Sequence, residues 1–122
     1  DSAGAGRTRG GLGQEIEIGS RIEQPFELLA AFDRVDHPPR GKDGGGNGQP
    51  ATVSLKSGKK LKGKGFQVIP AADRLCINTP GGGGLGSPSE RPAEAVANDL
   101  AEGRISKRTA REVYGHAGAP KR

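Results

Sequence analysis

A run of glycines near residue 80 limits what this chain can fold into more than any other feature. Five of the seven residues from Pro80 to Gly86 are glycine. Glycine has no Cβ atom, so its backbone can adopt positive φ values or approach another backbone closely. We interpret the tract as a tight passage from strand to helix. A phosphate-binding loop is disfavoured, because Ser87 to Arg91 separate the tract from the next helix and no lysine follows within it.

The composition predicts a thin hydrophobic core. Only 31% of the 122 residues are apolar, with three Phe, one Tyr, no Trp and no Met, and a chain of this length suits one domain. The 22 glycines and nine prolines make up about a quarter of the residues, so ordered pieces joined by mobile loops are expected. No apolar window approaches the ~18 residues of a membrane span and no secretory signal is recognisable, which predicts a soluble, cytoplasmic protein.

Short apolar segments with alternating or β-prone residues predict strands. The segment from Phe26 to Phe32 also tolerates a helix, but Pro25 and the turn residues that follow favour a strand. Residues 33–50 have no apolar period and predict a long surface loop. The runs at 52–55 and 66–69 are expected to form a hairpin-like unit about a lysine-rich turn. The expected strands cover residues 14–18, 26–32, 52–55, 66–69 and 74–79.

Two short helices are expected at the C-terminal end. Apolar residues spaced for one helical stripe occur at Ala93, Val96, Ala97 and Leu100. Ser106 is expected to cap a second helix that runs to Tyr114, with Ala110 and Val113 on its inner face and Gly115 as its stop.

Together these segments predict an α+β fold. It is β-rich, with short, mostly antiparallel strands and long Gly-rich loops, and two short C-terminal helices close it. We expect one domain, with a β-rich subdomain over residues 1–86, a helical pair over 87–115 and a disordered tail over 116–122. Because the chain begins at Asp1, without an initiator methionine and directly in a glycine-rich turn, we expect a fragment of a longer protein.

The first thirteen residues carry candidate binding groups. Their backbone N–H groups and the guanidinium groups of Arg7 and Arg9 could form an anion-binding nest. The glycine spacing matches neither phosphate-loop motif, and a strand follows instead of a helix, so a structural turn is favoured. Candidate substrate or interface residues are Arg7, Arg9, Gly10, Gly11, Gly13, Gly81, Gly82, Gly83 and Gly84.

Two further groups of residues are weaker candidates for a metal site or a catalytic nucleophile. Asp33, Asp36 and His37 form the one tight cluster of carboxylates and imidazole, but the prolines and glycines that follow give ligands little support, so turn hydrogen bonds are favoured over a metal. The single cysteine, Cys76, alternates with Leu75 and Ile77. A small packed side chain is therefore favoured over a nucleophile.

Basic residues exceed acidic ones by 19 to 14, which gives a net charge of +5. An acidic partner or nucleic acid is one interpretation, with contacts through residues 56–64 and the basic C-terminal end. Aromatic side chains that could stack on bases are nearly absent. We therefore favour a solvated face and disfavour nucleic acid.

Three segments in order resemble a known family. They are Arg9 to Glu15, with the sequence RGGLGQE; Ile69 to Gly86, which contains the glycine tract; and a helical tail that ends in REVYG at Gly115. Together they resemble the C-terminal end of the hydantoinase B/oxoprolinase family, and the similarity covers essentially the whole chain.

The resemblance implies a part of a cytoplasmic enzyme that opens cyclic amides, such as 5-oxoproline or hydantoins, with ATP hydrolysis. In such enzymes an A-type subunit or domain handles ATP, and the B-type one completes ring opening, in several members with a divalent metal. The metal motifs belong to the N-terminal part of the family, and no residue here matches them. We therefore expect no catalytic residue, metal ligand or cofactor in this chain, which would support folding and assembly with an A-type partner and be inactive alone. The alternative is a small basic binding module.

Overall fold

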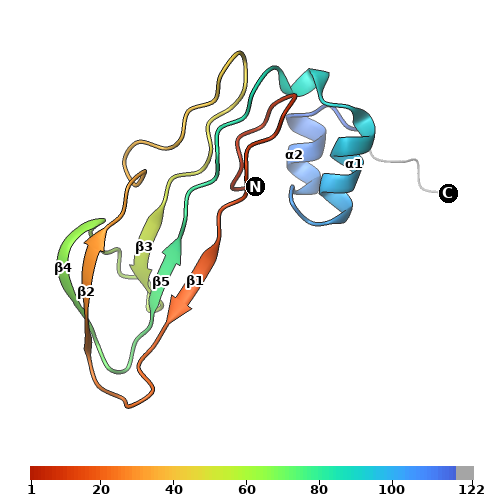
Figure 1. The fold of residues 1–122 in the computed structure, drawn as a ribbon. Helices are drawn as coiled ribbons and strands as arrows, with labels where there is room; N and C mark the ends of the chain where they lie inside the picture. Colours follow the sequence, from red (N-terminus) through yellow and green to blue (C-terminus); the bar gives the residue numbers. More distant parts are fainter. Residues whose placement is uncertain (118–122) are drawn as a thin grey trace. The chain divides into compact units, whose positions relative to one another are not determined.

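The computed structural model describes residues 1–117, which form two compact units. One unit contains residues 13–38 and 50–80, and the other contains residues 1–12, 39–49 and 81 onward. Figure 1 follows the chain through both units. The fold is α+β and β-rich, as the sequence predicts, with antiparallel strand pairing and two short helices. The tail expected over residues 116–122 lies, from residue 118 on, outside the described residues.

The strands of the first unit form two antiparallel sheets. A three-stranded sheet has β5 (Leu75–Asn78) in the middle, between β1 (Glu15–Ile18) and β3 (Thr52–Leu55). A two-stranded ribbon pairs β2 (Phe26–Ala31) with β4 (Lys64–Ile69). The strand expected from residue 26 is confirmed, and the loop over residues 33–50 contains no helix or strand.

The predicted hairpin-like unit of residues 52–55 and 66–69 is wrong. The turn after β3 does fold back, since Leu61 N–H donates to the Val53 carbonyl at 2.9 Å. The chain then leaves this neighbour, and β4 pairs with β2 while β3 pairs with β5. Burial explains this pairing, because it brings five apolar side chains from β3, β4 and β5 into one core. Alternation within each strand shows which side chains are buried but not which strands pair. The core residues are Val53, Leu55, Ile69, Leu75 and Ile77.

The second unit contains a short 3₁₀ helix, η1 (Pro88–Glu90), and two α-helices, α1 (Ala93–Ala101) and α2 (Lys107–Glu112). The predicted cap is confirmed, because the Ser106 hydroxyl accepts the Thr109 N–H at 3.1 Å. Helix α2 ends two residues before Tyr114, and the prediction that Val113 lies on the inner face is wrong, since its side chain is 46% exposed. Tyr114, four positions after Ala110, fills the buried site instead. The helical core consists of Val96, Ile105, Ala110 and Tyr114.

Three glycine-rich segments form the rest of the second unit, and we call them the glycine bundle: residues 1–12, 39–49 and 81–86. They contain no regular strand and are joined by backbone hydrogen bonds. The third segment bonds alternately to the other two: Gly82 N–H donates to Gly11 and Gly84 N–H to Gly46, both at 2.9 Å. The bundle therefore holds together segments that are far apart in the sequence.

Close backbone approach explains why the bundle needs glycine. A Cβ atom added at most of its glycines would overlap backbone atoms of another segment, as happens at the crowded axis of collagen. Gly86 is the one residue of the tract with positive φ, at 74°. The tract is therefore a packed segment as well as a passage toward a helix. Glycines of this kind are Gly4, Gly6, Gly10, Gly45, Gly48, Gly81, Gly83 and Gly84.

Candidate functional site

Most of the candidate residues lie in the glycine bundle. Arg7, Arg9, Gly10, Gly11 and the tract from Gly81 to Gly84 belong to it, whereas Gly13 belongs to the other unit. A Cβ atom on Gly13 would overlap the carbonyl of Thr79. The structure thus brings the two glycine clusters of the sequence into direct backbone contact.

Several backbone N–H groups that could have bound an anion already have partners. Gly10 donates to the Gly4 carbonyl at 3.0 Å, and Gly81 donates to Gln49 at 3.2 Å. Gly82 and Gly84 donate to carbonyls of the other two segments. An anion at this position would compete with these bonds, so the arrangement favours backbone packing. A substrate or interface contact through these glycines stays a prediction.

The two arginines of the first segment differ in environment. The side chain of Arg7 is exposed, and its backbone carbonyl accepts a hydrogen bond from Nη1 of Arg91 at 3.1 Å. The side chain of Arg9 is largely buried and donates to Asp99, with Nε 3.0 Å from Oδ2 and Nη2 3.2 Å from Oδ1. Arg9 is therefore engaged within the fold.

Arg9, Arg91 and Asp99 form a buried ionic cluster, which we call the Asp99 cluster. Asp99 lies on α1 with 2% of its surface exposed, and Arg91 Nη2 donates to its Oδ2 at 2.8 Å. Arg104 is more distant, with Nη1 3.8 Å from Oδ1. Charge-assisted bonds of this geometry are among the strongest hydrogen bonds in proteins. The cluster joins the first glycine segment to the helices within one unit.

The protonation state of Asp99 follows from this environment. Burial by itself would raise the pKa of Asp99, but the hydrogen bonds and charges of Arg9 and Arg91 outweigh burial and hold the pKa below its usual value. Burial also raises the pKa of the neighbouring Tyr114 hydroxyl. A carboxylate whose oxygens accept hydrogen bonds from two guanidinium groups is a poor proton carrier. We therefore interpret the cluster as a structural contact that holds the two segments together.

Sequence reasoning missed Asp99 as the centre of a cluster. A signal was present, because Asp99 lies three positions after Val96 on the stripe that faces the core. A carboxylate on an apolar stripe requires a buried cation. No local pattern distinguishes Arg9 and Arg91 among the 19 basic residues as its partners.

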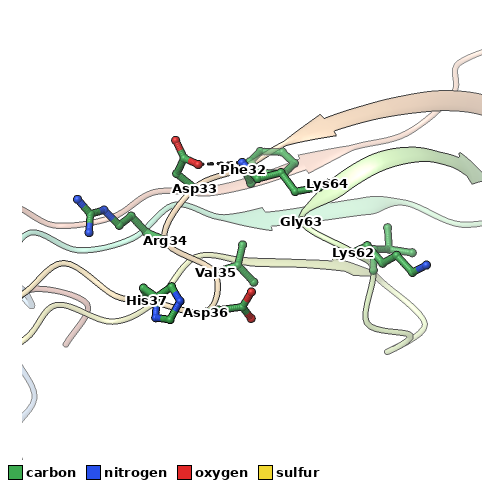
Figure 2. Close-up of a pocket in the computed structure, with 10 residues that line it drawn as sticks. Phe32, Asp33, Arg34, Val35, Asp36, His37, Lys62, Gly63 and Lys64 are labelled. Carbon is green, nitrogen blue, oxygen red and sulfur yellow. Dashed lines mark hydrogen bonds and ion pairs between the residues drawn. The ribbon is translucent and has the colours of Figure 1, made fainter.

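The other unit contains an open pocket of about 680 Å³ where β2 ends and β4 begins. Figure 2 shows Asp36 and His37 on one loop and the ion pair of Asp33 with Lys64, 2.8 Å apart. Asp33, Asp36 and His37 all line this pocket, but no group of three acidic, His or Cys side chains in residues 1–117 is placed to hold a metal ion. The walls are Phe32, Asp33, Arg34, Val35, Asp36, His37, Leu61, Lys62, Gly63 and Lys64.

The lysine-rich segment at 56–64 is partly neutralised. Lys56 Nζ lies 2.7 Å from Oε2 of Glu17, and Lys64 pairs with Asp33. The hydrogen bond from Lys56 lowers the pKa of Glu17, although desolvation opposes this in part. Lys59, Lys60 and Lys62 are exposed. The positive field of this segment is therefore weaker than its sequence indicates.

Cys76 has no disulfide partner. Cys76 is half-buried on β5, and its side chain lies on the opposite face of the strand from the buried Leu75 and Ile77. Among residues 1–117, no helix has the length and apolar character needed to cross a membrane.

The amino-acid sequence is similar to that of a known family and of several known proteins. The family model for hydantoinase B/oxoprolinase matches residues 1–88, which include every glycine segment. An uncharacterised protein of Methanocaldococcus jannaschii is 38% identical over 117 residues, which cover 93% of this chain and 20% of that protein.

Two further relatives carry names of the same family. The B-type subunit of a putative D-/L-hydantoinase from a Pseudomonas species is 31% identical over 124 residues, which cover 94% of this chain and 20% of that protein. The 5-oxoprolinase 1 of Arabidopsis thaliana is 38% identical over 91 residues, which cover 71% of this chain and 7% of that protein. The chain thus spans a fifth or less of the length of these curated relatives.

Proposed function

Because the chain belongs to the hydantoinase B/oxoprolinase family, we propose that it is the C-terminal part of an ATP-dependent enzyme that opens cyclic amides. Its substrates would be five-membered rings such as 5-oxoproline or a hydantoin. The observation that supports this most is the family match over residues 1–88. In this proposal the chain supports the fold and assembly of the enzyme and does not itself perform the reaction.

The geometry supports a structural role for this part. Arg9, one of the two candidate arginines, is bound to Asp99. The glycines of the tract pack on the backbone of other segments. A carboxylate held in this way cannot act as a general base without first losing its partners. Nucleophile, base and ATP site would lie in the rest of the enzyme, together with any divalent metal.

We propose an A-type, ATP-handling subunit or domain as the partner. The Pseudomonas relative is named as one subunit of a hydantoinase, which motivates a second subunit for the enzyme to which this chain belongs. The Asp99 cluster and the glycine bundle would give that assembly a rigid element, because both link segments that are distant in the sequence.

Activity assays on matched preparations test the proposal. The 122-residue chain and a longer polypeptide that ends in it are each assayed with and without the A-type partner, and the assays measure ADP release and ring-opened product from 5-oxoproline and hydantoin. We expect ATP-dependent product from the longer polypeptide with its partner, and none from the 122-residue chain alone. Product from the short chain, or none from the complete pair on either ring, contradicts the proposal.

A small basic module that binds nucleic acid or an acidic partner is the second candidate. Exposed Lys59, Lys60 and Lys62 support it. Binding through these lysines would weaken steeply with salt, because contacts with phosphate release counterions. Failure of the chain to shift single- or double-stranded nucleic acid at low salt contradicts a nucleic-acid module.

A further inference from the structure

One face of the β2–β4 ribbon carries large apolar side chains that are exposed. We call it the ribbon face and define it by Leu29, Phe66 and Val68, which are 66%, 73% and 62% exposed. Leu29 lies directly opposite Phe66 in the antiparallel register, and Val68 lies opposite Glu27. Positions opposite each other share a face and alternate with the other face, so the three side chains are neighbours on one surface.

The opposite face of the ribbon is covered. Phe26 and Leu28 pack against the core, and Ile69, which lies opposite Phe26 in the register, is fully buried. The ribbon therefore has one face in the core and one apolar face in solvent. A two-stranded ribbon is marginally stable in water unless it is covered, and exposed apolar patches rimmed by polar groups mark interaction sites.

We propose that the ribbon face docks on the remainder of the longer B-type polypeptide. This inference rests on the proposed function, in which the chain is the C-terminal part of that polypeptide. The chain spans a fifth or less of its relatives, so at least four fifths of such a protein is available to cover the face. The occupant is an aliphatic or aromatic surface, because burying Leu29, Phe66 and Val68 stabilises the contact only against apolar atoms.

A second copy of the chain is the less favoured occupant. Each 122-residue chain carries a net charge of +5, which opposes association of two identical chains. The ribbon face is therefore assigned to the rest of the same polypeptide, and self-association of the chain would be a contrary result in the footprinting experiment.

Hydroxyl-radical footprinting compares the 122-residue chain with the longer polypeptide that ends in it. Labelling of Phe66 should fall about tenfold in the longer polypeptide, because a side chain that is surrounded by other side chains is no longer accessible to the radicals in water. Leu29 and Val68 should be protected with it. Equal labelling in the two proteins overturns the proposal. Protection in the short chain that grows with protein concentration also overturns it, because a second copy then covers the face.

Substitutions give an independent measurement. Val68→Thr keeps the shape and β propensity of the side chain and replaces one methyl group with a hydroxyl. We expect little change in the melting temperature of the 122-residue chain and a clear decrease in that of the longer polypeptide. The control is Ile18→Thr, a half-exposed apolar strand residue outside the ribbon face. An equal effect of Val68→Thr in both proteins contradicts docking.

Different results would contradict the proposed ring-opening function and the proposed docking of the ribbon face. ATP-dependent ring opening is measured on the same preparations as the footprint. Activity without protection of Phe66 overturns docking and leaves the function standing. Protection without activity contradicts the function and leaves docking standing.

Discussion

Arg9 binds both carboxylate oxygens of Asp99, ninety positions later in the sequence. Its Nε lies 3.0 Å from Oδ2 and its Nη2 3.2 Å from Oδ1, and Asp99 is almost completely buried. Arg91 adds a third bond at 2.8 Å. Because two separate guanidinium groups share one carboxylate, this contact fixes the position of α1 relative to the first segment of the glycine bundle.

Removing the carboxylate charge should destabilise the protein strongly. Asp99→Asn leaves two buried guanidinium groups without their counter-charge, and we expect the free energy of unfolding to fall by about 3 kcal/mol. Urea denaturation measures this change. The control is Glu112→Gln, which removes an exposed ion pair with Arg108 on the surface of α2 and should cost less than about 0.5 kcal/mol. Equal losses in both variants would mean that the cluster is not a joint.

Stability should fall in acid for the same reason. The pKa of Asp99 is lower in the folded protein than its usual value, so its contribution is fully present above the unfolded pKa of about 3.9 and is lost as the pH falls through the folded pKa. Urea midpoints from about pH 2 to about pH 7 measure the loss. Asp99→Asn should remove part of this acid dependence, whereas an unchanged pH profile in the variant would contradict the assignment.

A single methyl group should disrupt the glycine bundle. A Cβ atom on Gly84 would overlap the Ala5 carbonyl, and backbone atoms cannot move aside as a side chain does. We expect Gly84→Ala to cost about 3 kcal/mol, at the upper end of the cost of overpacking. Gly11→Ala is the matched control, because no atom lies within 4 Å of its added Cβ. Thermal unfolding distinguishes the two variants, and equal melting temperatures would show that the bundle is not close-packed.

Loss of the cap on α2 should have a moderate effect. Ser106 accepts the Thr109 N–H through its side chain, and Ser106→Ala should cost about 1 kcal/mol. Ser106→Asp retains an acceptor at the same position and should recover most of this stability. Helicity by circular dichroism and the urea midpoint check both variants. No difference between Ala and Asp at this position would exclude a capping role.

Local patterns predicted most of the secondary structure. Alternation, β-prone residues and the flanking turn residues together located the strands, and Ser106 and Gly115 marked the ends of the segment that contains the second helix. Pairing was harder to predict, because the alternation of β3 and β4 is compatible with several partners. The choice of β5 for β3 and of β2 for β4 depends on which arrangement buries Ile69 with Leu75.

The candidate residues could be found in the sequence, but their partners could not. Arg9 was a candidate because of its position in a glycine loop, and nothing local connects it to Asp99. Val113 was placed on the inner face because it lies one helical turn after Ala110, but the helix ends at Glu112, and Tyr114 fills the buried position.

The amino-acid sequence was enough to locate the helices and strands and to indicate the family. Periodicity and helix caps depend on residues that are close in the sequence, so they can be read along the chain. Only folding packs the three glycine segments together, and this close approach is what leaves no room for a Cβ atom at most of their glycines. Folding also places Arg9 against Asp99. Such contacts join residues far apart in the sequence, and they form only where the folded backbone excludes water and brings the charges within hydrogen-bond distance.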